Sequence, residues 1–319
     1  MNFEWDLLYN DDAAFPRLLQ FGEFEDSRFR YGISGQPERC LYFHFPDDIR
    51  NKRIEPVEMV NLLFSEDTVE GRPTLILTLR NENFIRLFDD LIRSLVMQAR
   101  QDDRNATKAG FIALCNEWFG LFDPLSSGVS RPELQGLYGE LDFLLYLLEH
   151  SASPPNDLLG SWKGPWGKGH DFEMGISLFE IKSATENNPV IHISSEYQLD
   201  CLDGQRMFLV VSFFAVQPGA GVHIRQLVDD ITAILRTKPG VNMNLFWAAL
   251  AKAGLTFDSL AKYDAFLFEI RETRYFDCNA GGFPSLRRSA LPDTIRNIRY
   301  ELDPGTLELY RIADITPYL

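Results

Sequence analysis

Glu180 and Lys182 are residue types that could act together on a divalent cation and a phosphate group. They stand two residues apart in Ser177-Leu-Phe-Glu-Ile-Lys-Ser183, a short apolar segment typical of a strand. Residues at i and i+2 of a strand point to the same face, so the two side chains would lie together. The carboxylate can ligate a divalent cation, while the lysine can orient an attacking water and offset charge on a scissile phosphate. An ordinary ion pair is the alternative, because Glu-x-Lys is a common tripeptide.

Asp171 and Glu140 add two further carboxylates. A tight hairpin between Asp171 and Glu180 would place them on neighbouring strands. Mg²⁺ favours oxygen ligands from one or two carboxylates, and it lowers the pKa of bound water. Glu140 follows Leu137 and precedes Leu144 in one helical stripe, where a carboxylate is costly to bury without a partner. The alternatives are a strand-end role for Asp171 and a core-edge position for Glu140.

Other polar residues carry weaker signals. Gln198, at what reads as a helix start, can hydrogen-bond a phosphate or water, or act as a local cap. Residues 164–169 superficially resemble a phosphate loop but lack Gly-Lys-Ser/Thr opening a helix, so we expect a turn, with Trp162 and Trp166 as packing residues. His170 and His192 are isolated in the sequence, so we expect core or surface histidines and not metal ligands. Four arginines near the C-terminus form either a DNA-binding patch or a solvated face: Arg287, Arg288, Arg296 and Arg299.

These residues need an α/β frame to position them. A helix should begin after Ser130, the N-cap of a capping box with Glu133. Strand and helix patterns then alternate, which predicts a central mixed sheet flanked by helices over residues 126–319. The expected elements after the core motif are a strand at 207–216, helices at 222–236 and 242–253, a strand at 265–271, and short strands at 295–302 and 307–312.

Residues 1–125 have no catalytic spacing and predict an α+β accessory domain. Strand patterns occupy residues 41–45 and 74–79, and helical patterns occupy 84–96 and 111–119, with Asn81 or Asn83 as a cap. The turn-forming stretch 124–132 reads as the boundary between the two domains. Partner or DNA recognition is the functional alternative for this first region.

Composition sets limits on the function. The chain has 319 residues and a net charge of −15, with an acidic excess in both halves, which argues against strong unaided binding to DNA. No apolar run is long enough for a membrane span, no secretory signal pattern opens the sequence, and the four cysteines are dispersed. We therefore expect a cytoplasmic protein with reduced thiols and no membrane association.

The order Glu140, Asp171, Glu180-Ile-Lys182 resembles the PD-(D/E)XK nuclease superfamily. Further motifs are similar to an uncharacterised group within it, and they lie at Gly136–Leu141, Trp162–Pro165, Asp171–Phe172, Glu180–Ser183 and Ile193–Leu199. The resemblance implies a restriction-endonuclease-like core at 126–319, with Asp171, Glu180 and Glu140 as metal ligands. It also implies Lys182 as the catalytic lysine, Gln198 as an auxiliary residue, and a bacterial or archaeal restriction or phage-defence setting. His170 stands where the superfamily often has proline.

Two functions follow as hypotheses. The first is a DNA endonuclease that uses Mg²⁺, for which Mn²⁺ can substitute, working with other defence-system proteins and as a homodimer if it cuts both strands. The second is a nuclease-fold scaffold or binding subunit that is silent without a partner. The complete set of expected catalytic residue types favours the first, and the charge of −15 together with the large N-terminal region favours the second.

Overall fold

The chain divides into two compact units in this computed structural model. The structure describes residues 3–9, 14–22, 26–36, 38–46, 53–122, 128–167, 169–216, 218–257 and 259–319. The first unit comprises Met1–Leu125 with Asn242–Asn244, and the second comprises Ser126–Val241 with Leu245–Leu319. The expected boundary stretch lies partly outside the described residues, which resume at residue 128.

The first unit is built on an antiparallel sheet. Its strands follow the order β1-β2-β3-β6-β5-β4. Their bounds are β1 Arg17–Leu19, β2 Phe29–Ile33, β3 Arg39–His44, β4 Val57–Glu58, β5 Leu62–Val69 and β6 Arg72–Leu79. The predicted strands at 41–45 and 74–79 correspond to β3 and β6, which pair in register from Cys40 opposite Thr78 to His44 opposite Thr74. The other strands of this sheet were not predicted.

Helices complete the first unit. They are α1 Trp5–Tyr9, η1 Glu82–Phe84, α2 Ile85–Gln101, α3 Lys108–Phe119 and η2 Gly120–Phe122. Asn81 accepts a hydrogen bond from the backbone N–H of Asn83, so the predicted cap is present at the start of η1. Leu87, Leu91 and Leu95 are fully buried on one face of α2, as their spacing of four residues predicts.

The second unit contains the predicted mixed sheet, with strand order β13-β11-β10-β8-β7. Its bounds are β7 Phe172–Met174, β8 Ser177–Thr185, β10 Arg206–Phe214, β11 Ile270–Asp277 and β13 Arg311–Ile312. Only β8 and β10 are parallel among these neighbours, and the other pairs are antiparallel. A separate antiparallel pair joins β9 Ile191–Ile193 to β12 Tyr300–Leu302. The fold is therefore α/β with a mixed sheet, as the sequence predicts.

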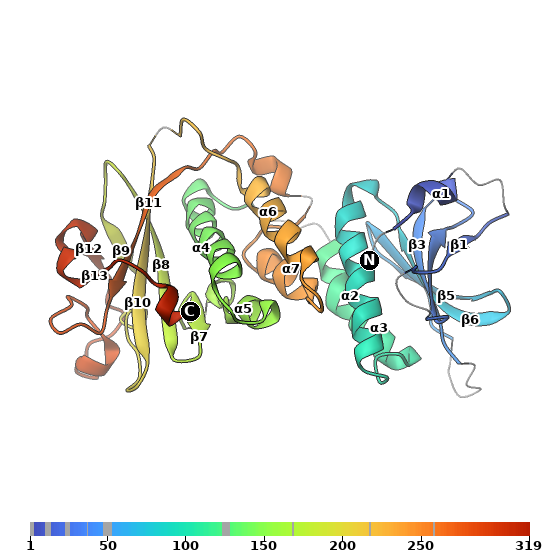
Figure 1. The fold of residues 1–319 in the computed structure, drawn as a ribbon, viewed down its shortest axis with the longest axis horizontal. Helices are drawn as coiled ribbons and strands as arrows, with labels where there is room; N and C mark the ends of the chain where they lie inside the picture. Colours follow the sequence, from blue (N-terminus) through green and yellow to red (C-terminus); the bar gives the residue numbers. More distant parts are fainter. Residues whose placement is uncertain are drawn as a thin grey trace. The chain divides into compact units, whose positions relative to one another are not determined.

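Helices lie along one side of this sheet, and Figure 1 shows α4 beside β8. The helices are α4 Arg131–His150, α5 Pro155–Ser161, α6 Ile224–Thr237 and α7 Met243–Lys252, of which residues 243–244 group with the first unit. Single turns occur at η3 Gly164–Trp166, η4 Leu260–Tyr263, η5 Arg288–Ala290, η6 Pro304–Thr306, η7 Glu308–Tyr310 and η8 Thr316–Tyr318. Helix α5 was not predicted.

A close approach of α4 to β8 fixes the site's geometry. A Cβ added at Gly139 would lie 3.1 Å from Ser183 Oγ and 3.6 Å from Ile181 Cγ2, so only a glycine leaves the backbone this close without a shift. One turn further along α4, Phe143 packs edge-on against Phe172 and at a tilt against Phe179, with ring centroids 5.1 Å and 5.3 Å apart. The contacts hold the face of β8 that carries Phe179 and Ile181 against the helix.

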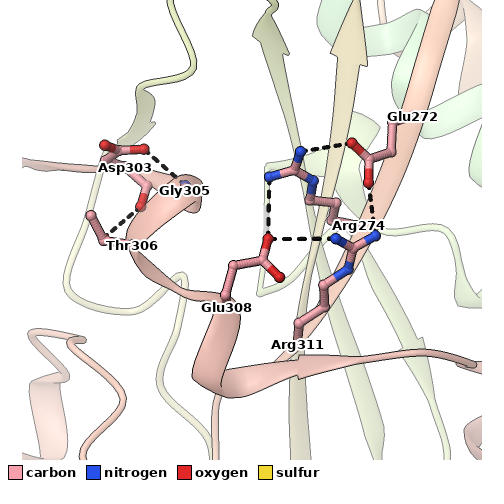
Figure 2. Close-up of polar contacts among 7 residues, drawn as sticks. All are labelled: Glu272, Arg274, Asp303, Gly305, Thr306, Glu308 and Arg311. Atoms are coloured by element: carbon pink, nitrogen blue, oxygen red, sulfur yellow. Dashed lines mark hydrogen bonds and ion pairs between the residues drawn. The ribbon is translucent and has the colours of Figure 1, made fainter.

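Polar contacts attach the C-terminal segment to β11 (Figure 2). Arg274 lies 2.7 Å from Glu272 and 3.4 Å from Glu308, and Arg311 lies at the same two distances from the same two acids. Asp303 caps the neighbouring turn, accepting from the N–H of Gly305 at 2.8 Å. The alternating charges form a closed ring that links β11 to the residues around β13.

Three sequence predictions need correction. The strand expected at 265–271 begins at Ile270 instead, because the charged residues of β11 pair with one another and Phe276 supplies the buried contact. The two C-terminal strands are shorter than predicted, and each pairs with an earlier strand. The segment containing Gln198 forms a turn, where a helix start was expected.

Candidate active site

Helix α4 positions Glu140. The helix begins with the predicted capping box, in which Ser130 and Glu133 satisfy each other's backbone N–H groups. Leu137, Leu144 and Leu147 are buried on the stripe that contains Glu140. Glu140 itself is half-buried, so it lies at the edge of the core. Its Oε2 accepts a hydrogen bond of 2.7 Å from Trp162 Nε1, a contact that the sequence analysis missed by treating Trp162 as packing only.

The hairpin of β7 and β8 positions Asp171 and Glu180. Phe172 pairs with Phe179 in the antiparallel register, which places the preceding residue, Asp171, opposite Glu180. β7 starts only at Phe172, and Asp171 Oδ2 accepts from the backbone N–H of Ile181 at 2.7 Å. The carboxylate thus takes the place of a ladder partner at the end of the short strand. The prediction that one hairpin brings the two carboxylates onto neighbouring strands agrees with this register.

The loop around Gly164 brings Glu140 and Asp171 to a common space. The carbonyl oxygen of Asp171 accepts from the backbone N–H groups of Lys163 at 2.7 Å and Gly164 at 3.1 Å. A Cβ at Gly164 would collide with Glu140 Oε2 and lie 3.1 Å from Asp171 Oδ1. The absence of a side chain at this position therefore leaves room between the two carboxylates. The segment forms a single 3-10 turn with no following helix, so it is a turn, as predicted, although Trp166 is 43% exposed where packing was expected.

Lys182 completes the cluster from β8. Its Nζ lies 2.8 Å from Glu180 Oε1, so the predicted same-face placement holds. Glu180 is 2% exposed and the side chain of Lys182 is 16% exposed. The lysine is the only basic side chain paired with these carboxylates by an ion pair within the described residues. Its ammonium has three donor hydrogens, so contact with Glu180 leaves donors for another ligand.

Burial and mutual repulsion shape the protonation of the three acids. Burial is the main cause that raises the pKa of Glu140 to about 8, and the charge of Asp171 adds to it. The same two causes, in the same order, raise the pKa of Glu180 to about 8, while Lys182 opposes them. Burial also raises the pKa of Asp171 despite the hydrogen bond from Ile181. Three carboxyl groups share a single lysine, so a bound cation would favour their ionised forms and lower these raised pKa values.

The free oxygens of this cluster suit a hard divalent cation. One oxygen of each carboxylate accepts a hydrogen bond, from Trp162, Ile181 or Lys182. The second oxygens of Glu140, Asp171 and Glu180 have no hydrogen-bond partner among the described residues. Mg²⁺ and Mn²⁺ prefer carboxylate oxygens as ligands, and an oxygen that accepts no hydrogen bond is available to bind them. No group of three or more His, Cys, Asp or Glu within the described residues already has a metal-holding arrangement.

Gln198 has a local contact. Its side-chain oxygen accepts from the backbone N–H of Ser194 at 2.7 Å, which is the capping alternative raised from the sequence. No described contact joins it to the three carboxylates. His170 is half-buried, and its Nε2 lies 2.8 Å from the carbonyl oxygen of Asp200, a contact that ties the residue before Asp171 to a distant loop. His192 is a surface histidine, one of the two expected placements, and its Nδ1 lies 3.2 Å from Glu301.

The C-terminal arginines mostly contact their own loops. Arg287, Arg288 and Arg296 donate to backbone carbonyls, including those of Cys278, Leu291 and Asp293. Arg288 also lies 3.9 Å from Glu196, whose carboxylate accepts from the N–H groups of Asn297 and Ile298. These contacts give three of the four arginines a structural role, and Arg299 is exposed.

The second unit thus has the mixed sheet, the packed helix and the edge cluster of acids with lysine that define the PD-(D/E)XK nuclease-like class of α/β proteins. The chain belongs to the family whose description reads "Putative PD-(D/E)XK family member, (DUF4420)", and the family model matches residues 3–304. Neither a curated protein nor a solved structure matches the chain. Among the described helices, none has the length and apolar character needed to cross a membrane.

Proposed function

We propose that the chain is a divalent-metal-dependent endonuclease that hydrolyses DNA phosphodiester bonds. The observation that carries the proposal is the cluster of Glu140, Asp171 and Glu180 beside Lys182, built by α4 and the β7–β8 hairpin. Family membership supports nuclease-type chemistry. In this proposal the second unit is the nuclease domain and the first unit is an accessory or recognition domain.

The roles of the residues follow from their contacts. Asp171, Glu180 and Glu140 would hold the cation, with Mg²⁺ as the expected ion and Mn²⁺ as a substitute. When bound, such an ion polarises a phosphoryl oxygen and lowers the pKa of water. The Ile181 N–H orients Asp171, and Trp162 Nε1 orients Glu140. Lys182 has donor hydrogens left to hold a water or a phosphate oxygen, where its charge offsets the charge that develops during hydrolysis.

The half-buried state of Glu140 and Asp171 supports access of substrate to this site. Glu180 lies deeper, at 2% exposure, and its orientation is fixed by Lys182. A site with two accessible acids and one enclosed acid can bind an ion from solvent while keeping its inner ligand in place. Gln198 is proposed only as an auxiliary residue that shapes the 194–198 turn, because its amide oxygen is already engaged.

A second candidate function is a nuclease-fold subunit that cuts only with a partner. The net charge of −15 favours it, because phosphate backbones repel an acidic protein. A phage-defence or restriction setting in the cytoplasm, with other defence proteins supplying DNA affinity, fits this charge. A homodimer would bring two such sites together for double-strand cutting.

Incubation of the purified protein with plasmid and linear DNA tests both candidates. The reactions contain Mg²⁺, Mn²⁺ or EDTA and compare wild type with Asp171→Asn and Lys182→Ala. Lys262→Ala, which removes an exposed lysine of the same unit, serves as the matched control. We expect metal-dependent cutting that the first two variants reduce by about 10³-fold, the scale of losing one group that stabilises a transition state, and that the control leaves intact.

Isothermal titration with Mn²⁺ separates the alternatives. Wild type that binds Mn²⁺ through Asp171 without cutting DNA would favour the partner-dependent subunit. Cutting that persists in EDTA, or in Lys182→Ala at the wild-type rate, would refute the proposed site.

A further inference from the structure

A polar cavity lies in the first unit. It is an open pocket of about 380 Å³ at one end of the antiparallel sheet, where Ser27 and Arg28 precede β2, His44 ends β3 and Arg72 begins β6. Its other lining residues are apolar or glycine, so no acid lines it among the described residues. In a chain with a net charge of −15, a cavity lined by two arginines and a histidine is a local exception.

His44 lines this cavity, and one nitrogen of its ring has no hydrogen-bond partner among the described residues. His44 is 4% exposed, and its Nδ1 lies 2.8 Å from Thr74 Oγ1. The Thr74 hydroxyl donates its only hydrogen to the carbonyl oxygen of Arg72, at 2.9 Å, so it must accept from a protonated Nδ1. Nε2 is buried and has no hydrogen-bond partner among the described residues. Such a group is costly unless a ligand or water satisfies it.

The two arginines leave donors available at the same cavity. Arg28 uses Nε and Nη2 in a two-point contact with Asp26, at 2.9 Å and 2.8 Å, which leaves Nη1 without a described partner. The Arg72 guanidinium is exposed and makes no hydrogen bond to a described side chain or carbonyl. A backbone hydrogen bond joins the end of β3 to the residue before β2: the N–H of His44 donates to the carbonyl oxygen of Arg28 at 2.7 Å.

We propose that this cavity binds a phosphate group of the nucleic-acid backbone through Arg72, Arg28 and protonated His44. Arginine forks match phosphate oxygens, and protonation would turn His44 Nε2 into a third donor. The inference rests on the proposed function in naming DNA as the source of the phosphate. The accessory unit would then bind the substrate directly, and the cavity would supply positive charge for DNA in an otherwise acidic chain.

The charges around His44 make this binding dependent on pH. Burial lowers the pKa of His44, the nearby charges of Arg30 and Arg72 lower it further, and Glu70 opposes them. Without a bound phosphate, the His44 side chain is therefore mostly neutral near pH 7, and a bound phosphate favours its charged form. Binding takes up a proton, so affinity must fall as the pH rises.

Fluorescence anisotropy of a short labelled DNA duplex with the full chain in EDTA tests the proposal without cleavage. Arg72→Gln is compared with Arg104→Gln, which removes the same charge from an exposed arginine outside the cavity. We expect Arg72→Gln to weaken binding several-fold and to reduce the slope of log K against log salt by about 1, the effect of one phosphate contact. The control should retain the wild-type slope. Equal losses in the two variants, or no loss in either, would overturn the proposal.

The same assay at pH 6 and pH 8 tests His44. Wild type should bind more tightly at pH 6, and His44→Gln should lose most of this difference while its unfolding temperature reports that it remains folded. Wild-type affinity that is the same at both pH values would overturn the role of His44.

Two controls identify the ligand and separate the two proposals. If inorganic phosphate stabilises the protein through Arg72 while wild type does not bind DNA, the cavity takes a free anion and the DNA assignment is wrong. Lys182→Ala should still bind DNA in an Arg72-dependent way. If wild type binds DNA in this Arg72-dependent way but does not cut it with Mg²⁺, the result counts against the nuclease proposal alone.

Discussion

Replacing Glu140 by glutamine tests whether the cluster is built for a cation. The amide of the variant would keep an oxygen to accept from Trp162 Nε1, as Glu140 does now, while removing the charge that Asp171 repels. The pKa of Glu140 in the folded protein is about 8, whereas its ordinary value is 4.5. The stabilisation from the bound proton is therefore complete below pH 4.5 and is lost as the pH rises through 8.

The size of the effect follows from the shift. Raising the pKa of Glu140 from 4.5 to about 8 corresponds to at most about 5 kcal/mol at about 1.4 kcal/mol per unit. This is an upper limit because Asp171 and Glu180 share the repulsion. Without metal, Glu140→Gln should therefore unfold at a higher temperature than wild type at pH 8. A domain of this size shifts by about 2–4 °C per kcal/mol.

Thermal unfolding in EDTA at pH 5 and pH 8, followed by circular dichroism, measures the effect. At pH 5 the two proteins should unfold at similar temperatures, because Glu140 is then mostly protonated in the folded state. Glu186→Gln, at an exposed position, provides the matched control and should change little at either pH. Added Mg²⁺ should stabilise wild type at pH 8 more than Glu140→Gln. A variant that is less stable than wild type at pH 8 in EDTA would refute this reasoning.

Three further substitutions test neighbouring contacts. Trp162→Phe removes the donor to Glu140 and should cost about 1–3 kcal/mol of unfolding free energy, since a buried acceptor loses its partner; unchanged stability in urea titrations would argue against that bond. Gly164→Ala places a Cβ against Glu140 Oε2 and should weaken Mn²⁺ binding measured by calorimetry, whereas wild-type affinity would show that the loop moves aside freely. Arg311→Gln opens the ring with Glu308, and because the ring is partly exposed it should cost at most about 1 kcal/mol by urea unfolding; a larger loss would mean that the ring anchors the C-terminal segment.

Local signals explain which predictions succeeded. The capping box at Ser130 and the leucine stripe around Glu140 lie within one helix, so periodicity and cap chemistry were enough to locate α4. Glu180 and Lys182 lie within one strand, so the alternation of side chains along β8 was enough to place both on one face. Strand β5 was missed, because its apolar and polar residues do not alternate cleanly, whereas β2 was missed although Phe29, Tyr31 and Ile33 alternate with Arg30 and Gly32. Strand β11 was misplaced, because it contains charged residues such as Glu272 and Arg274, which pair with one another along the strand.

The sequence by itself determined the mixed α/β frame and the residue types of the candidate site. Only the tertiary structure decided how these residues meet. Trp162 reaches Glu140 from another segment, Asp171 takes a backbone N–H of β8, and the missing side chain at Gly164 leaves their shared space open. The same holds for His44, whose unpaired nitrogen follows from contacts between strands far apart in sequence. Spacing fixes which way a side chain points from its own element, but the partner it meets depends on packing between elements.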